Sequence, residues 1–299
     1  MVERCPRTRG RAQKRSNRWP ILIALAVLIG GAWVAKTFLT GPAEPLNILL
    51  LGVDEGQTRT DVVVLAHVDP KQNRVSLLSL PRDTLVEIDC GSAKPCQSPD
   101  KLAHAHAYGG KNGPAFAMKS VSNLLGVKVD HYVRVDYAGF QAVVDRLGGV
   151  EILIDHNMDY EDPYAHPPLR IHFKASTQPQ HLDGEDALRY VRFRADGLGD
   201  IGRIERTKRF ALALIETSKK NGSIAQWPGL VNALWPYLST DLDLRSAVAL
   251  AKVVSRTDPA HMDVEILPGK DDPNSPRGWV WVADRAKARE VVERMGLAK

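Results

Sequence analysis

An uninterrupted apolar segment near the N-terminus constrains this chain more than any other feature. Residues 19–35 (WPILIALAVLIGGAWVA) contain no charged side chain, and Lys36 closes the run. At about 1.5 Å per residue, a helix of this length lies at the short end of the range that spans a bilayer. Trp19 and Trp33 stand near its two ends, where interfacial aromatic residues belong. The segment therefore predicts a transmembrane anchor over residues 19–36, and a cleaved secretory signal peptide is the alternative.

The basic excess of the chain is confined to the arm before this segment. The sequence holds 40 lysines and arginines against 35 acids, and seven of these basic residues and one acid lie in residues 1–18. This leaves 33 basic and 34 acidic residues after Arg18. The positive-inside rule places the arm in the cytoplasm and the chain after the anchor outside the cell membrane. Because this external region is close to neutral, we expect no nucleic-acid partner.

Two of the three cysteines lie close together in the external region. Cys90 and Cys96 flank a short loop (CGSAKPC), whereas Cys5 lies in the basic arm. An oxidising compartment favours a local disulfide between such a pair, worth roughly 2 kcal/mol for a loop this small. Two free thiols and half of a zinc site are the alternatives, although the sequence lacks the second cysteine pair that a zinc ribbon needs.

Strands and helices alternate along the external chain. Apolar, β-rich runs predict strands at 46–53, 62–68, 75–80, 131–135, 150–154 and 264–267. Helical spacing and capping residues predict helices at 114–125, 137–147, from Asp183 onward, at 203–220, and around 224–238, 244–255 and 284–295. Turn-forming residues at 69–74 indicate an early hairpin. This order predicts an α/β fold in which a mixed β-sheet is sandwiched by helices on both faces (α/β/α).

The same reading divides the chain into segments. No internal repeat occurs, so we expect one external domain after the anchor. Glycine and proline at 268–278 indicate an exposed loop. The expected segments are a cytoplasmic basic arm at 1–18, the transmembrane anchor at 19–36, a linker at 37–45, an extracytoplasmic domain core at 46–221 and a C-terminal helical part at 222–299 packed on the same domain.

Two carboxylates stand at the ends of neighbouring predicted strands. Asp54 ends the first strand, and Arg59 and Asp61 open the next one. Carboxylates placed in this way can converge on one Mg²⁺ through oxygen ligands. Turn and capping roles for both residues are the alternative.

Arginines gather at the ends of other predicted elements. Arg82 directly follows strand 75–80, and Arg203 and Arg206 lie at the start of a long helix. Arginine suits bidentate binding of phosphate, and a helix N-terminus adds positive charge of its own, so these positions predict an anion site. Arg192 and Arg194 share one face only if the preceding helix stops near Tyr190 and the chain continues extended. Any one of these arginines alone is more often a solvated surface residue.

Ordered motifs give the chain a resemblance to a known family. They are NILLLGVD with TRTDVVVLAHVD, VSLLSLPRDT, KLAHAHAYGG, DHYVRVDYAGFQAVVDRLGGVEI, LDGEDALRYVRFR and GDIGRIER. In this order, over residues 47–220, the chain resembles the LytR-CpsA-Psr family. The resemblance implies a membrane-anchored phosphotransferase, assisted by Mg²⁺, that moves a glycopolymer from a polyprenyl-pyrophosphate carrier to cell-wall peptidoglycan. It also implies an α/β/α sandwich fold.

The resemblance assigns roles to individual residues. It implies that Asp54 and Asp61 bind the metal and that both take part in catalysis together with Arg59. The family's last motif usually ends in Arg-Gln, where this chain has Arg206 and Thr207. The residues that the resemblance places around the pyrophosphate are Arg82, Lys101, Arg192, Arg194, Asp200, Arg203 and Arg206.

Three other functions compete with transfer. A hydrolase would cleave the same lipid pyrophosphate with water as the acceptor. A membrane-bound transcriptional regulator is a label attached to this family, but the near-neutral external region argues against DNA binding. A non-catalytic wall- or lipid-binding module would require the acidic pair and the arginines to be scattered in space.

Overall fold

The computed structural model describes the external part of the chain. It covers residues 44–54, 56, 59–165, 168–193, 195, 199–221, 227–258 and 262–297. The predicted arm at 1–18, the predicted anchor at 19–36 and most of the linker lie outside the described residues. Within the described ranges, no helix combines the length and the apolar character that crossing a membrane requires.

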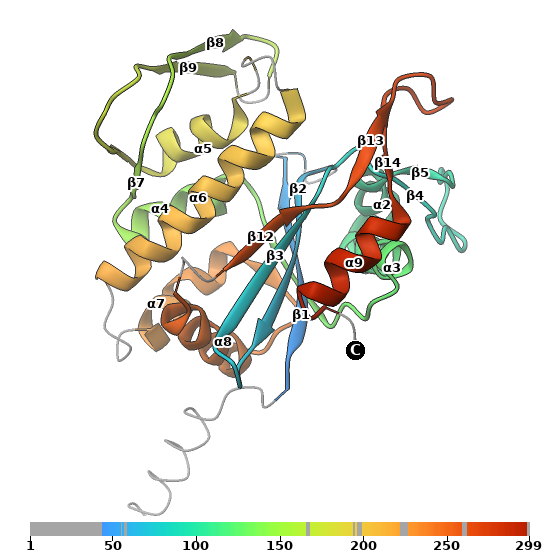
Figure 1. The fold of residues 1–299 in the computed structure, drawn as a ribbon, viewed down its shortest axis with the longest axis horizontal. Coiled ribbons are helices and arrows are strands. Elements are labelled where there is room, and N and C mark those ends of the chain that lie inside the picture. Colours follow the sequence, from blue (N-terminus) through green and yellow to red (C-terminus); the bar gives the residue numbers. More distant parts are fainter. Residues whose placement is uncertain are drawn as a thin grey trace, which may run out of the picture. The chain divides into compact units, whose positions relative to one another are not determined.

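A six-stranded mixed sheet forms the centre of the described chain (Figure 1). Its strand order is β11-β6-β1-β2-β3-β12. Its strands are β1 (Leu46–Val53), β2 (Thr60–Asp69), β3 (Arg74–Leu80), β6 (His131–Val135), β11 (Ser239–Thr240) and β12 (Asp263–Ile266). β2 runs antiparallel to both β1 and β3, whereas β6 runs parallel to β1 and β12 parallel to β3.

The predicted hairpin between β2 and β3 is confirmed. Asp69 pairs with Arg74 at its end. The Asp69 carboxylate accepts hydrogen bonds from the backbone N–H groups of Lys71 and Gln72, and Asn73 adopts a φ of 48°, in the left-handed region that asparagine tolerates. This tight turn fixes the register of the two central strands.

Helices cover both faces of the sheet (Figure 1). On one face, alternate strand residues such as Leu49, Leu65 and Leu78 pack against α2 (Leu102–Gly109), α3 (Gly113–Leu125) and α9 (Arg285–Arg294). On the other face lie α4 (Tyr137–Leu147), α5 (Gly184–Arg192), α6 (Gly199–Asn221), α7 (Trp227–Leu234) and α8 (Leu244–Arg256). The predicted mixed sheet between helical layers is confirmed.

Smaller elements pack around these layers. Near α5 and α6, a second apolar cluster joins β7 (Val150–Ile152), β8 (Met158–Asp162), β9 (Leu169–Phe173) and β10 (Gln180–Leu182). On the opposite side of the sheet, β4 (Leu85–Val86) pairs with β5 (Asp100–Lys101). A disulfide joins Cys90 and Cys96 in the loop between these two strands. The described residues also include two short 3₁₀ turns, Gly110–Asn112 and Trp235–Tyr237.

The C-terminal part departs from the expected helical character. Besides α7, α8 and α9, it supplies two strands to the central sheet: β12, which confirms the strand predicted at 264–267, and β11, where no strand was predicted. The expected exposed loop at 268–278 instead begins with β13 (Gly269–Asp272), which pairs with β14 (Val280–Ala283). The sequence GKDD of β13 carries no strand signal of its own. Its conformation comes from pairing with the apolar strand VWVA, which a pattern within one segment does not reveal.

Candidate active site

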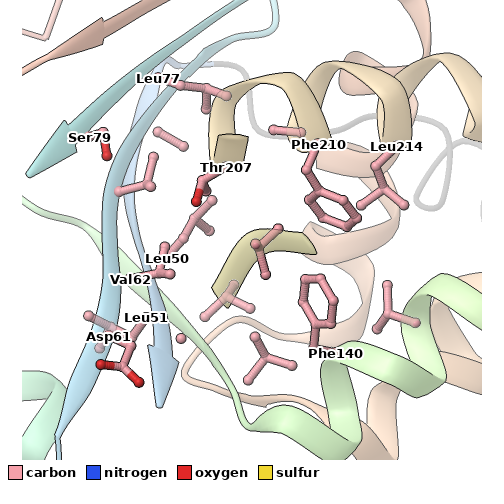
Figure 2. Close-up of a pocket in the computed structure, with 18 of the residues that line it drawn as sticks. Leu50, Leu51, Asp61, Val62, Leu77, Ser79, Phe140, Thr207, Phe210 and Leu214 are labelled. Atoms are coloured by element: carbon pink, nitrogen blue, oxygen red, sulfur yellow. The ribbon is translucent and has the colours of Figure 1, made fainter. Parts of the chain in front are cut away.

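A cavity of about 1040 Å³ lies between one face of the central sheet and the helices that cover it (Figure 2). Leu50, Val62 and Leu77 enter it from the sheet, and Phe140, Phe210 and Leu214 enter it from α4 and α6. Well-packed protein cores contain few voids larger than a water molecule, so a space of this volume marks a ligand site. Several of the lining residues have short side chains, which leave room for a ligand: Gly52, Ala66, Ser79, Ala211, Ala247 and Ala251.

Charged side chains border this cavity where three strands end. The pairing of Gly52 with Val62 brings the end of β1 to the start of β2, and the pairing of Val63 with Leu80 brings the end of β3 to the same edge. We call this charged edge of the cavity the mouth. The structure therefore brings together five of the residues predicted for the site: Asp54, Arg59, Asp61, Arg82 and Arg192.

Two donors among the described residues hold Asp61 at the mouth. Arg82 Nη1 lies 2.6 Å from its Oδ1 atom, and the Tyr137 hydroxyl donates to its Oδ2 atom at 2.9 Å. Tyr137 opens α4 directly after β6, whose parallel pairing of Val135 with Gly52 carries it to the mouth. Burial, and then the adjacent Asp61 carboxylate, raise the pKa of Tyr137 to about 12, with Arg192 opposing the rise. The phenol is therefore protonated, and a hydrogen-bond donor, at neutral pH.

Asp83 links Arg82 to Lys101 behind the mouth. Its Oδ2 atom accepts from Arg82 Nε at 3.3 Å, and its Oδ1 atom lies 2.8 Å from Lys101 Nζ. Burial alone raises the pKa of Asp83, but pairing with Lys101 and Arg82 outweighs it and leaves the pKa below the usual range. Lys101, which was predicted to contact pyrophosphate, is thus connected to the mouth through Asp83. It is not one of the described residues that border the cavity.

Arg192 is the last residue of α5. Its guanidinium carbon lies 4.7 Å from the centre of the Tyr137 ring. Within the described part of the chain, no carboxylate forms an ion pair with it. For Arg192 and Arg194 to share one face, this helix would have to stop near Tyr190. It continues to Arg192 instead, because buried Tyr190 and Val191 extend its apolar face. The chain turns extended only at Phe193, with φ −61° and ψ 139°.

The other predicted pyrophosphate residues lie differently. Arg206 is only 4% exposed, donates to the backbone carbonyl of Phe193 and stacks over its ring at 5.1 Å. It is not among the described residues that border the cavity, whereas its neighbour Thr207 is. Arg194 lies outside the described residues, and so do the side chains of Asp200 and Arg203, whose backbone belongs to α6.

Comparison with known proteins decides the family. The sequence pattern of the LytR_cpsA_psr family matches residues 34–296. The chain belongs to the LytR-CpsA-Psr family.

Curated members of the LytR-CpsA-Psr family are similar in sequence. TagU of Enterococcus faecalis, a polyisoprenyl-teichoic acid–peptidoglycan teichoic acid transferase, is 34% identical over 207 residues, covering 67% of this chain and 62% of TagU. TagV of Bacillus subtilis, also described as a polyisoprenyl-teichoic acid–peptidoglycan teichoic acid transferase, is 30% identical over 234 residues, covering 76% of this chain and 58% of TagV. The chain spans about three fifths of the length of each of these relatives.

Solved LytR-CpsA-Psr structures share the fold. The crystal structure of B. subtilis TagV superposes with a TM-score of 0.71 at 28% identity, covering 86% of this chain and 99% of TagV. TagT bound to LI-WTA superposes with a TM-score of 0.64 at 27% identity, covering 84% of this chain and 89% of TagT. A B. subtilis protein described as the transcriptional regulator yvhJ has a TM-score of 0.62 at 22% identity and shows the fold alone.

The sequence motifs assign no role to two residues of this LytR-CpsA-Psr site. Asp83 directly follows Arg82 in the sequence PRD, and its charge next to a predicted site arginine is a signal that could have identified it. No such signal marks Tyr137, because an aromatic residue at the start of an amphipathic helix is usually an ordinary packing position. Only the parallel pairing of β1 with β6 places its hydroxyl at Asp61.

Proposed function

We propose that this protein is a membrane-anchored phosphotransferase that moves a glycopolymer from a polyprenyl-pyrophosphate carrier to peptidoglycan or a related acceptor. The observation that carries the proposal is the union of a charged mouth with a large apolar cavity. An isoprenoid tail requires an apolar enclosure, whereas its diphosphate requires cationic hydrogen-bond donors. The names of the curated relatives, which pair a polyisoprenyl-linked polymer with peptidoglycan, support the same substrates.

The charged residues of the mouth suit phosphoryl transfer. Such transfer depends mainly on positioning and on positive charge around the phosphoryl oxygens, and Arg82 and Arg192 supply that charge. The oxygen of the acceptor hydroxyl bonds to the phosphorus that carries the glycopolymer, and the bond from that phosphorus to the bridging oxygen breaks. Polyprenyl monophosphate leaves. Asp61, or Asp54 beside it, accepts the hydroxyl proton.

The acidic pair fits Mg²⁺ as a partner of the substrate. Among the described residues, no three histidine, cysteine or acidic side chains gather into a metal cage. Mg²⁺ commonly uses one or two carboxylates together with substrate phosphates and water, and Asp54 and Asp61 border the same mouth. These two residues would hold the ion. When bound, it neutralises charge on the phosphoryl oxygens.

The N-terminal segments suit an enzyme whose donor is a membrane lipid. The basic arm at 1–18 and the apolar run at 19–36 support a single-pass protein with a cytoplasmic N-terminus and an extracytoplasmic catalytic domain. An anchor of this kind keeps the cavity close to the bilayer that holds the lipid carrier before it binds.

The test is a transfer assay with the full chain in detergent. A polyprenyl-pyrophosphoryl oligosaccharide serves as donor, with Mg²⁺, and with or without peptidoglycan. We expect the oligosaccharide to become bound to peptidoglycan through one phosphate, with release of polyprenyl monophosphate, and Arg82→Ala to lose most of this activity. Arg285→Ala, on the exposed side of α9, is the matched control.

The alternatives give different results in the same assay. Equal release of sugar phosphate with and without peptidoglycan, and no attachment, would identify a hydrolase. No turnover of the donor under either condition would contradict catalysis. For the regulator alternative, a salt-sensitive shift of DNA by the full chain would be required.

A further inference from the structure

Tyr137 contacts two predicted site residues at once. Its hydroxyl meets Asp61, and its ring meets Arg192. We propose that Tyr137 is a positioning residue that holds Asp61 with its hydroxyl and Arg192 with its ring, in the places where both act. This inference rests on the proposed phosphotransferase function and adds a residue to it that neither the motifs nor the family resemblance assigned.

The hydroxyl fixes the orientation of the Asp61 carboxylate. Arg82 donates to one carboxylate oxygen at 2.6 Å, and Tyr137 donates to the other at 2.9 Å. Donors on different oxygens restrain rotation about the terminal bond of the side chain more than a donor on one oxygen does, so the Tyr137 hydroxyl adds to the hold that Arg82 provides. Since Asp61 is proposed to accept the proton of the acceptor hydroxyl, an error in its orientation affects the chemical step more than substrate binding.

The ring holds Arg192 without using its donors. A guanidinium over an aromatic face is attracted by the ring quadrupole and keeps its five N–H groups for other partners. At 4.7 Å from the ring centre, Arg192 has this geometry, and no carboxylate among the described residues pairs with it. An ion pair would instead occupy two of those donors. Arg192 is therefore held at the mouth in a form ready to bind phosphate oxygens.

Close contacts hold the backbone that carries Tyr137. Asp136 caps α4 by accepting from the Gly139 N–H at 2.8 Å, and Phe140 N–H bonds to the Asp136 carbonyl at 2.8 Å. Gly139 lies so close to the chain that an added Cβ would come within 2.5 Å of the Tyr237 carbonyl oxygen. The first turn of α4 is thus fixed from two sides, and it presents Tyr137 in one place.

Three single variants of the full chain separate the two roles. Tyr137→Phe removes the hydroxyl and keeps the ring, and Tyr137→Leu removes both. Tyr132→Phe, on β6 and packed against the core on the other face of the sheet, is the matched control. Each is assayed for transfer of the oligosaccharide described above, and its affinity for farnesyl pyrophosphate is measured by calorimetry. Thermal melting checks the fold.

We expect the two losses to differ in kind. Tyr137→Phe should lower kcat about tenfold and leave KM and the affinity unchanged, because one hydrogen bond to a charged group is lost. Tyr137→Leu should show the same loss in kcat and, in addition, bind farnesyl pyrophosphate about fivefold more weakly. In an Arg192→Ala background, Tyr137→Leu and Tyr137→Phe should bind the probe equally. A purely structural role would not produce this dependence on Arg192.

The outcomes distinguish this inference from the proposed function. If wild type and Tyr132→Phe both fail to transfer, the proposed function fails. If wild type transfers and Tyr137→Phe matches its kcat, the hydroxyl role is overturned. Equal affinity of Tyr137→Leu and Tyr137→Phe with Arg192 present overturns the ring role. If Tyr137→Leu melts early, Tyr137→Met, whose flexible side chain fills the same space, makes the same comparison.

Discussion

Asp61 and Arg82 are 21 positions apart in the sequence, yet the carboxylate and guanidinium meet at 2.6 Å. The hairpin that joins β2 to β3 produces this contact. Its register pairs Val63 with Leu80, so that two residues further on Asp61 stands opposite Arg82. One tight turn at the far end of the hairpin therefore sets the geometry of an acid and an arginine at the mouth of the cavity.

Loss of the Arg82 guanidinium is expected to slow transfer strongly. Arg82→Ala removes a charged hydrogen bond, worth about 1.5–3 kcal/mol, and should lower the initial transfer rate about ten- to a hundredfold. Arg82→Lys should recover part of the rate, because lysine keeps the charge but lacks the planar fork. An Arg82→Ala variant that folds normally and transfers at the wild-type rate would remove Arg82 from the site.

Arg206 is expected to support the fold and not the chemistry. Arg206→Ala leaves the carbonyl of Phe193 without its buried donor, which should lower the free energy of unfolding by about 1–3 kcal/mol. Urea titration measures this loss, and kcat of the folded variant should stay within about twofold of wild type. Arg192→Ala is the matched comparison, with normal stability and slower transfer. Wild-type stability together with a large loss of kcat in Arg206→Ala would place Arg206 in catalysis.

Filling the cavity is expected to exclude the lipid tail. Ala251 on α8 lines the apolar wall, and Ala251→Phe occupies space that the tail needs. Exclusion of even two buried carbons, at about 0.8 kcal/mol each, weakens binding about tenfold. Affinity for a long-chain polyprenyl pyrophosphate is measured by calorimetry, with Ala286→Phe at an exposed position of α9 as the control. Unchanged affinity in Ala251→Phe would show that the tail binds elsewhere.

Asp83 is expected to make stability depend on acidic pH. Pairing with Lys101 and Arg82 outweighs burial and holds the pKa of Asp83 below its usual range. Its contribution to stability is therefore present above about pH 4 and is lost as the pH falls through the lower pKa of the folded state. Urea titration should therefore show that Asp83→Asn lowers the free energy of unfolding at pH 7, and that this loss becomes progressively smaller toward pH 3. A constant difference across this range would contradict the pairing.

The Cys90–Cys96 disulfide is expected to be structural. Replacing both cysteines with serine should lower the free energy of unfolding by about 2 kcal/mol, because the open loop gains freedom in the unfolded chain. Thiol labelling of intact, non-reduced full chain measures the bond directly, and Cys5 in the same molecule reports that the reagent works. Labelling of all three cysteines would show that the bond is absent.

Much of the fold and part of the site followed from local pattern. Apolar, β-rich runs located β1, β2 and β3, and the ends of these strands place Asp54, Asp61 and Arg82 at one edge. The sequence was sufficient for this prediction because, in neighbouring antiparallel strands, the end of one strand lies beside the start of the next.

Other features depend on packing that no segment encodes alone. In the sequence, Arg206 looks like any other arginine of an amphipathic helix. Its side chain is buried because it contacts the carbonyl and the ring of Phe193, and the sequence of the helix alone does not show this contact. The cavity is a space left by small side chains on separate elements, such as Ala66 on β2 and Ala247 on α8, so no motif marks it. The acidic segment Gly269–Asp272 forms strand β13 because it pairs with β14.

The central claim is that one site binds the lipid tail in the cavity and the diphosphate at its mouth. A crystal structure of the protein with a short polyprenyl pyrophosphate and Mg²⁺ tests it most directly. We predict electron density for the tail between the sheet and α4, α5, α6 and α8, with phosphate oxygens within hydrogen-bond distance of Arg82 and Arg192. A tail bound outside this cavity, or a diphosphate that contacts neither arginine, would contradict the account.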